Sequence, residues 1–413
     1  MVRHQVAGAL LGGVLSLALA CSGCDSTSGS AATSGAPATA AAAGSARPAA
    51  TQASPSPQAG QPLSCAARVF SRMTMAQRAG QLFAVGIATS PGSKAARAVR
   101  TYHFGSLLVG TTTTASLAEL RQVTAADQAL ASAAATAQVR FFIAADQEGG
   151  EVQRLRGAGF AVIPSAVTQG ELAPATLQRE AAGWGSELKR AGVNLDLAPV
   201  MDVVPPGTTG RNQPIGALRR EFGSDPPTVA AHGVAFLRGL RQAGVAATAK
   251  HFPGLGRVTG NTDLSAGVVD PVTAPGDPYL GSFQAAIDAG VPFVMVSLAS
   301  YPRIDPHHLA VFSSRTMRTL LRERMHFGGV IISDDMGAAA AVASLSPAAR
   351  AIAFLSAGGD MILSDSLPAA AAMDTAVLAK MKRDPAFRSV ADSAVMRILA
   401  AKQTYGLLPC TPA

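Results

Sequence analysis

Aromatic residues are scarce in this 413-residue chain, at 5%, with a single tryptophan and four tyrosines. Lysine and arginine give a formal net charge of +8, but they are scattered and form no cluster interleaved with aromatics. A nucleic-acid interface needs such a cluster, so we expect no nucleic-acid partner. Scattered positive charge instead suits a protein that works among anionic wall polymers and lipid headgroups.

Long apolar runs are also missing, apart from residues 6–20, which follow Arg3 and are too short to cross a bilayer comfortably. This pattern predicts that residues 1–20 are a secretory signal peptide. Residues 17–21 end in Cys21 and resemble a bacterial lipobox. We therefore expect a lipid on Cys21 and an extracytoplasmic chain anchored to the cell membrane. Cys24 is the rival lipidation site, and a simply secreted protein is the alternative.

Apolar periodicity is absent from residues 26–62, which are almost entirely Ala, Ser, Thr, Gly, Pro and Gln. Such a composition buries too little apolar surface to offset the entropy lost on ordering. We therefore expect residues 21–64 to be a disordered tether that holds the folded part on the order of tens of ångströms from the lipid.

Cysteine is rare as well, because only Cys65 and Cys410 of the four cysteines lie beyond the tether. They mark the first and last edges of the remaining region, residues 65–413. In an oxidising, extracytoplasmic setting this placement predicts a disulfide that joins the termini of one domain. Two unpaired thiols are the alternative.

The region beyond the tether alternates short apolar segments rich in β-formers with helical stretches, many of which begin at Pro, Ser or Asp and stop at Gly. This alternation predicts an α/β fold, either a doubly wound sheet or a closed barrel, and eight strand segments favour a single (β/α)8 TIM barrel. The expected strands are residues 81–87, 105–110, 139–145, 193–199, 245–249, 291–298, 329–333 and 360–363. Clear helical stretches are residues 117–137, 174–191, 226–243 and 278–289.

Polar side chains stand where several of these strands end, which is where α/β barrels carry their reactive groups. A run of β-formers delivers the carboxylate of Asp334 to the end of a buried strand, where it has no structural task. The alternative is that Asp334 caps an Ala-rich helix over residues 337–343. The polar residues at strand ends are Asp146, Asp196, Asp202, Lys250, His251, Asp334 and Asp335.

Three of these strand ends carry a family resemblance. Residues 146–150 (Asp-Gln-Glu-Gly-Gly), 250–256 (Lys-His-Phe-Pro-Gly-Leu-Gly) and 333–336 (Ser-Asp-Asp-Met) resemble motifs of glycoside hydrolase family 3, in its single-domain NagZ-type β-N-acetylglucosaminidase branch. With its lipobox and tether, the chain is similar to actinobacterial lipoproteins of that branch. The resemblance covers nearly all of residues 67–408. It implies a (β/α)8 barrel without metal or cofactor and retaining hydrolysis of a terminal β-linked N-acetylglucosamine.

Retaining hydrolysis needs one carboxylate that attacks the anomeric carbon and, about 5 Å away, an acid/base that protonates the leaving oxygen. The resemblance makes Asp334 the nucleophile, with Asp335 as the competing assignment. It also assigns sugar binding, where Arg219 competes with Arg220 because segment 215–223 is longer than the usual family motif. The sugar-binding residues implied in this way are Asp146, Arg154, Arg220, Lys250 and His251.

The acid/base position departs from the family pattern. The branch usually carries an Asp-Ser/Thr-His triplet in the loop after the fifth strand, whereas this chain has Asn261, Thr262 and Asp263. A carboxylic acid in a partly desolvated site can take a raised pKa and protonate a leaving oxygen, so Asp263 is the candidate acid/base. Glu148 and Asp202 are the possible substitutes, and loss of catalysis is the alternative.

Together these patterns predict an exo-acting, retaining β-N-acetylglucosaminidase of the cell envelope that acts on peptidoglycan fragments. The expected partners are a small carbohydrate substrate and the membrane that holds the lipid anchor, and we expect a monomer. A catalytically impaired lipoprotein that binds muropeptides is the alternative, because the usual histidine is missing. A β-glucosidase of the same family is a third reading.

Overall fold

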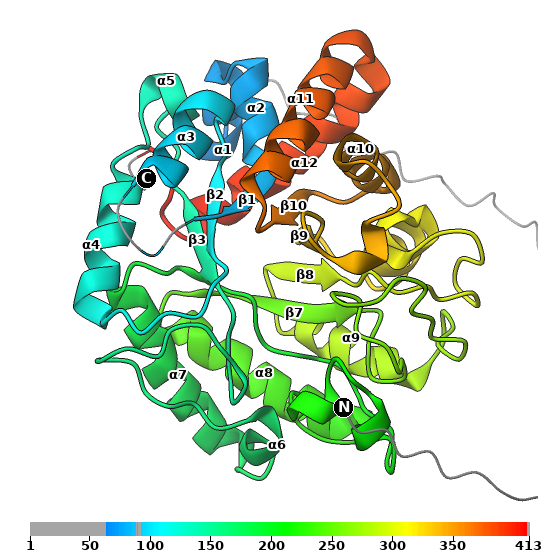
Figure 1. Cartoon of the computed structure of the whole chain (residues 1–413). Helices are drawn as coiled ribbons and strands as arrows, with labels where there is room; N and C mark the ends of the chain where they lie inside the picture. The colour runs from blue at the N-terminus through cyan, green and yellow to red at the C-terminus, as the bar shows by residue number, and fades with distance from the viewer. Residues whose placement is uncertain (1–62, 88, 90–91, 411–413) are drawn as a thin grey trace, which may run out of the picture. The chain divides into compact units, whose positions relative to one another are not determined.

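The computed structural model describes residues 63–87, 89 and 92–410. The predicted signal peptide (1–20), the lipidation site Cys21 and residues 21–62 of the predicted tether lie outside the described residues. Within the described part, parallel strands close into a barrel in the order β1-β10-β9-β8-β7-β6-β3-β2 (Figure 1). The prediction of a single (β/α)8 barrel is therefore confirmed.

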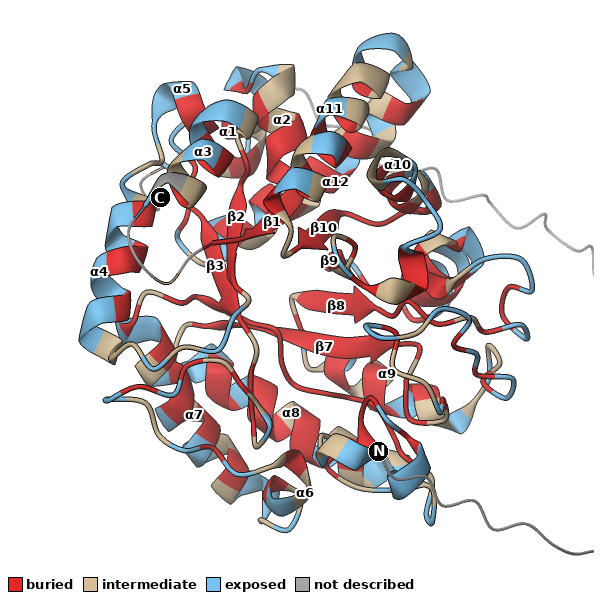
Figure 2. Cartoon of the chain, in the orientation of Figure 1, coloured by how far each residue is buried: buried red, intermediate tan, exposed pale blue. Residues whose placement is uncertain are grey.

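Each predicted strand segment contains or overlaps one barrel strand. The strands are buried because helices cover the outside of the barrel and side chains fill its centre (Figure 2). The barrel strands are β1 (Phe83–Gly86), β2 (Ser106–Val109), β3 (Phe142–Ala145), β6 (Leu195–Asp196), β7 (Ala246–Phe252), β8 (Phe293–Val296), β9 (Val330–Asp335) and β10 (Met361–Ser364). A separate hairpin pairs β4 (Gln147–Gly149) with β5 (Val152–Gln153) directly after β3.

Helices surround the barrel, and Figure 2 shows that they are buried on the face toward the strands and exposed on the other. The α-helices are α1 (Cys65–Arg72), α2 (Met75–Gln81), α3 (Ser93–Tyr102), α4 (Leu117–Gln128), α5 (Ala133–Thr136), α6 (Ala166–Gln169), α7 (Pro174–Arg190), α8 (Pro226–Gln242), α9 (Gly281–Asp288), α10 (Pro347–Ala357), α11 (Leu367–Arg383) and α12 (Pro385–Thr404). Short 3-10 turns are η1 (Thr209–Arg211), η2 (Gly216–Leu218), η3 (Pro278–Leu280), η4 (Ala310–Phe312) and η6 (Ala340–Val342), and η5 (Arg315–Arg324) is a π-helix.

Two helix predictions need correction. The stretch 117–137 is not one helix but α4 followed by α5. Two side chains stabilise the break between α4 and α5. Gln128 bonds the backbone N–H and C=O of Phe141, and Ser132 caps the start of α5. The stretch 278–289 begins as the 3-10 turn η3 and becomes helical only at α9.

The end of the chain closes the barrel at the N-terminal ends of its strands. Lys402 of α12 is buried, and its ammonium donates to the Gln81 side chain at 2.8 Å and to the carbonyl of Gly105 at 2.6 Å. Burial lowers the pKa of Lys402 to about 7. Within the described residues, no helix is both long and apolar enough to span a bilayer.

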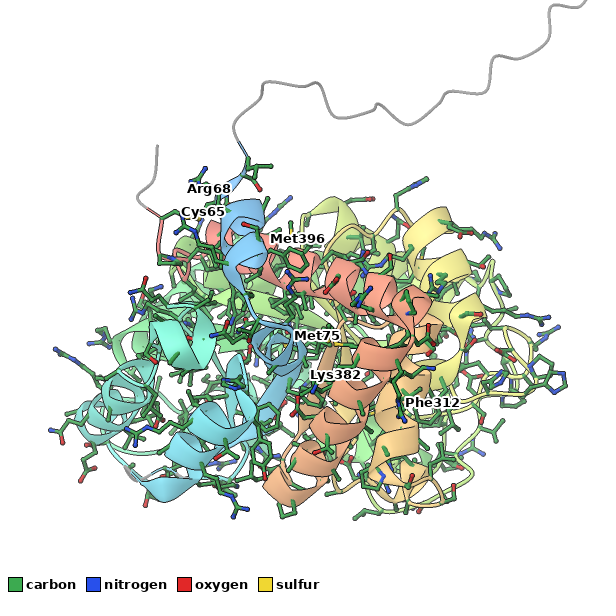
Figure 3. The ribbon with its side chains drawn as sticks, turned by 90° about the horizontal axis from the view of Figure 1, so that it is seen from above. Cys65, Arg68, Met75, Phe312, Lys382 and Met396 are labelled. Carbon is green, nitrogen blue, oxygen red and sulfur yellow. A yellow bond between two sulfur atoms is a disulfide. The ribbon has the colours of Figure 1, made fainter. Side chains whose placement is uncertain are left out.

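The two termini of the barrel are joined here. Cys65, at the start of α1, and Cys410 form a disulfide with Cα atoms 6.1 Å apart across a separation of 345 residues. Figure 3 shows Cys65 beside the C-terminal segment. Ser64 caps α1, and the backbone N–H of Ala66 bonds the side chain of Gln403, so α1 is also held to the end of α12 by hydrogen bonds.

Replacing both cysteines by alanine is expected to lower the free energy of unfolding by about 5 kcal/mol at most, because the open chain gains the conformational freedom of a very long loop. Denaturant unfolding of the double variant and of the oxidised parent measures the difference. Recovery of Cys65 and Cys410 as free thiols from exported protein would refute the bridge.

Candidate active site

A cavity of about 290 Å³ opens at the C-terminal ends of the barrel strands. Its volume is at the small end of the range for ligand sites, which suits a single small unit rather than an extended chain. All seven side chains predicted to bind sugar or perform the chemistry line this cavity: Asp146, Arg154, Arg220, Lys250, His251, Asp263 and Asp334.

A buried network of charges forms the floor beneath the cavity. The ammonium of Lys250, on β7, contacts Asp146 Oδ1 at 2.6 Å and Glu148 Oε1 at 2.5 Å. Arg220 donates Nε and Nη2 to the two oxygens of Glu148, each at 2.8 Å, in a bidentate pair. Charge-assisted bonds of this kind fix direction as well as distance, so the polar edges of Asp146 and Arg220 are set before a ligand arrives.

The pKa values in this network follow from burial and charge. Burial alone would raise the pKa of Glu148, but the charges of Arg220 and Lys250 lower it to about 2. Burial would lower the pKa of Lys250, yet Asp146 and Glu148 raise it above its ordinary value. Glu148, Arg220 and Lys250 are therefore charged near neutral pH.

Asp196 is a further buried carboxyl group close to this charge network. It ends β6, is fully buried, and accepts the backbone N–H of Gln147 at 3.0 Å. Burial raises its pKa to about 8, so it is protonated at pH 7. A neutral carboxyl at this position adds no further negative charge beside Asp146 and Glu148.

His251 is oriented by a buried carboxylate. Its Nδ1 lies 2.7 Å from Oδ2 of Asp202, whose Oδ1 accepts the backbone N–H groups of His251 and Leu255. The other ring nitrogen, Nε2, lies 3.4 Å from Nη2 of Arg220. A carboxylate on one nitrogen fixes the ring and leaves the second nitrogen for a ligand.

Arg154 and one of the neighbouring pair Arg219 and Arg220 complete the set of predicted sugar-binding arginines. Arg154 lines the cavity, with Nε 4.0 Å from Asp146 Oδ2. Arg219 adopts a left-handed backbone with φ of 56° and is exposed, whereas its neighbour Arg220 reaches the cavity. Arg220, not Arg219, is therefore the residue in position to bind a sugar.

Asp334 lies half-buried near the end of β9 and caps no helix. Its Oδ1 accepts the N–H of Asp335 at 2.8 Å, and residues 340–342 form only the short turn η6, which corrects the predicted helix over 337–343. Burial raises the pKa of Asp334, and Asp263 raises it further, while His251 and Lys250 lower it, with a net value of about 6. Asp335 instead holds the loop, because its Oδ1 accepts the N–H groups of Gly337 and Asp365.

Asp263 reaches the cavity from the loop after β7. Its N–H donates to the side chain of Asn261 at 2.9 Å, which forms a tight turn. The carbonyls of Thr262 and Asp263 accept the N–H groups of Ala341 and Ala340, so this loop is bound to the segment that follows β9. Asn261 thus shapes the loop that presents Asp263.

The two substitute acid/base candidates do not fit that role. Glu148 carries a pKa of about 2 and both its oxygens are occupied by cations. Asp202 is fully buried behind His251 and does not line the cavity. Asp263, in contrast, lines the cavity from a separate loop and lies close enough to Asp334 for the two charges to interact.

Sequence reasoning missed Asp365, which also lines the cavity. A Cβ at Gly86 would lie 1.9 Å from its Oδ1, and one at Gly110 would lie 2.6 Å from the same atom, so both strand ends leave room for this carboxylate. The sequence did contain a signal for Asp365. Residues 331–334 are Ile-Ile-Ser-Asp, and the end of the next strand repeats this pattern as Ile-Leu-Ser-Asp at residues 362–365. Among the described residues, no group of three acidic, histidine or cysteine side chains is arranged to hold a metal ion.

A closed parallel barrel with two carboxylates and a cluster of hydrogen-bonding charges in one cavity is the arrangement expected of a glycoside hydrolase. The family described as glycosyl hydrolase family 3 N terminal domain matches residues 74–400, and the chain belongs to this family.

Named relatives share this family. A β-hexosaminidase of Stenotrophomonas maltophilia is 38% identical over 260 residues, which cover 60% of this chain and 73% of the relative. A solved β-N-acetylhexosaminidase of Beutenbergia cavernae is 46% identical with a TM-score of 0.79, covering 80% of this chain and 99% of that one. LpqI of M tuberculosis is 26% identical with a TM-score of 0.71, covering 82% of this chain and 96% of that one.

The acid limb of the pH profile is expected to report Asp334. On an aryl glycoside whose leaving group needs no proton, kcat/KM should fall about tenfold per pH unit below the pKa of the nucleophile, since the protonated carboxyl cannot attack. That limb is expected near pH 6. Asp263→Asn removes a negative charge that raises this pKa, so it should move the limb to lower pH.

Asp334→Asn is the matched control, because it keeps the volume and removes the attacking oxygen. It should lose several orders of magnitude in turnover while still binding the sugar product. A limb that stays in place in Asp263→Asn, or an Asp334→Asn variant with more than about a tenth of parent activity, would exclude this assignment.

Proposed function

We propose that the chain is an exo-acting, retaining β-N-acetylglucosaminidase in which Asp334 is the nucleophile and Asp263 the acid/base. The observation that carries this proposal is that both carboxylates line one small cavity and lie close enough for their charges to interact, which disfavours ionisation of both at once and suits one acid and one nucleophile. The β-hexosaminidase relatives support the choice of sugar.

The geometry supports a two-step reaction. Oδ1 of Asp334 is held by the N–H of Asp335, which leaves Oδ2 to attack the anomeric carbon and form a glycosyl ester. In the same step Asp263 gives its proton to the glycosidic oxygen, so the aglycone leaves neutral. Asp263 then takes a proton from water, which attacks the same carbon and releases the sugar with its configuration retained.

The charged floor holds the terminal sugar. Lys250 and Arg220 present N–H donors, and Asp146 presents an acceptor, so several hydroxyls can be bound in one orientation. The cavity has room for a small unit and is bounded by these groups, which favours the end of a sugar chain over its interior. The family match and the two carboxylates in the cavity support an enzyme over a binding protein without activity.

The proposal includes the location of the protein at the cell membrane. Residues 1–21 fit a lipoprotein signal ending in Cys21, and the composition of residues 21–64 suits a tether. We infer a monomer anchored on the outer face of the cell membrane, where peptidoglycan fragments supply terminal N-acetylglucosamine.

Leaving-group dependence tests the role of Asp263. Asp263→Ala should spare the first step on an activated aryl N-acetylglucosaminide and strongly slow it on an unactivated disaccharide, because only the latter leaving group needs a proton. Azide should restore the second step, since a small anion attacks the intermediate without a general base. Stopped-flow release of the phenolate and product analysis separate the two steps.

Equal losses on both substrates without azide rescue would remove Asp263 from the acid/base role. A carboxylate at this position also repels phosphate, so the sugar should be released by water. Release of a sugar 1-phosphate when phosphate is added would contradict that expectation. An inactive parent that still binds N-acetylglucosamine would support the muropeptide-binding alternative instead.

Membrane attachment should depend on Cys21, because one lipidated residue supplies the anchor. After the membranes are washed in high salt, which removes electrostatic attachment, Cys21→Ala is expected to move the protein from the membrane to the soluble fraction, and Cys24→Ala is the matched control that should leave it bound. Immunoblots of the two fractions measure the change. Membrane retention of both single variants and of the double variant would disprove a lipobox at this segment.

A further inference from the structure

A second cavity, of about 700 Å³, lies at the end of the barrel opposite the active site. We name it the basal cavity, and its walls come from α4, α7, the residues before β3 and β6, and the segment after α12. Arg140 precedes the first residue of β3 by two positions and Asn194 directly precedes β6, so the cavity lies at the N-terminal ends of the strands. Barrel enzymes place their chemistry at the other end, so the basal cavity serves a different purpose.

The basal cavity is lined by cations and by no carboxylate. All of these cations are exposed, and none forms an ion pair within the described part of the chain. Cations gathered around one hollow repel each other and attract an anion. The four side chains are Arg121, Arg140, Lys189 and Arg190.

The two amide side chains of the basal cavity are already used by the fold. Asn194 bonds the N–H of Ile143 and the carbonyl of Phe141, and Gln128 bonds the backbone of Phe141. Lys189 donates only to the carbonyl of Gly244, at 3.1 Å. The charged donors available to a ligand are guanidinium and ammonium groups, and the guanidinium fork matches the oxygens of a phosphate.

The basal cavity lies at the end of the barrel where the described chain begins. The N–H of Arg140 bonds the carbonyl of Leu407, three residues before Cys410, and Cys410 is joined to Cys65. Leu63, the first described residue, is 60% exposed, and its carbonyl accepts from the exposed Arg68. Figure 3 shows Arg68 and Cys65 together at this end. The described part of the chain thus begins on the side of the basal cavity.

We propose that the basal cavity binds the phosphate of an anionic lipid headgroup, so that this end of the barrel docks on the membrane and the active site faces away from it. A lipid anchor at the end of a long segment does not by itself orient the barrel, whereas a basic patch that meets anionic headgroups does. Each cation near an anionic bilayer strengthens binding by about fivefold. A segment of about forty residues between Cys21 and the barrel would keep the local lipid concentration high.

Vesicle sedimentation tests the docking without the lipid anchor. The protein is the chain from Ser22 onward with Cys24→Ser, which keeps the whole folded unit, residues 61–413. It should bind vesicles of dioleoylphosphatidylglycerol, release them in high salt, and fail to bind vesicles of dioleoylphosphatidylcholine. Arg121→Glu with Arg190→Glu should weaken binding to the anionic vesicles at least about tenfold.

The matched control is Arg97→Glu with Arg179→Glu, which changes the net charge equally at exposed residues of α3 and α7 outside the basal cavity. The control should bind like the parent. The thermal unfolding midpoint of all variants should match the parent, which verifies folding whether or not the proposed enzyme activity holds. Hydrolysis of an aryl glycoside should also be unchanged, because both pairs lie away from the catalytic cavity.

Equal binding by the Arg121/Arg190 and control variants would overturn the basal cavity as the site. Equal binding of the parent to neutral and anionic vesicles would overturn an electrostatic headgroup site. Binding of soluble poly(glycerol phosphate) without binding of anionic vesicles would assign the basal cavity to a phosphate polymer and overturn docking on lipid.

Discussion

The active site depends on one buried interaction, the contact of Lys250 with Asp146 and Glu148. Removing these charges from water is costly, and the cost is offset only because each carboxylate meets a cation at close range and Arg220 completes the set. Loss of any one member would leave an unpaired buried charge. The network therefore links the ends of β3 and β7 to the loop of Arg220. It fixes the side chains of Asp146 and Arg220, which are proposed to bind the sugar.

The two carboxylates proposed as nucleophile and acid/base are held in different ways. Asp334 rises from a barrel strand and is held by the backbone, so its position is as fixed as the barrel itself. Asp263 lies on a loop and is exposed, yet that loop is hydrogen-bonded to Ala340 and Ala341 just beyond β9. The loop of Asp263 and the segment that follows β9 are thereby linked, and the side chain of Asp263 reaches the cavity.

The two ends of the barrel carry different kinds of residues. The C-terminal ends of the strands collect the acids and the charged floor, whereas the N-terminal ends carry the disulfide, the buried Lys402 and the basal cavity. Each barrel helix after a strand runs back toward the N-terminal end, and cations in the last turn complement its dipole. Lys189 and Arg190 at the end of α7 are such residues, so the same preference that suits the helix also makes this end of the barrel positive.

The sequence by itself determined the barrel and several of the residues at its strand ends, because burial and periodicity are local properties: eight apolar segments predicted eight strands, and the polar residues after four of them predicted a site. It could not determine which charges pair, since Glu148 meets Arg220 and Lys250 only when distant strands close into a ring. The backbone turn at Arg219 decided that Arg220 faces the cavity, and the glycines opposite Asp365 show their purpose only in three dimensions. Pairing across the barrel depends on closure, and closure is a property of the tertiary structure.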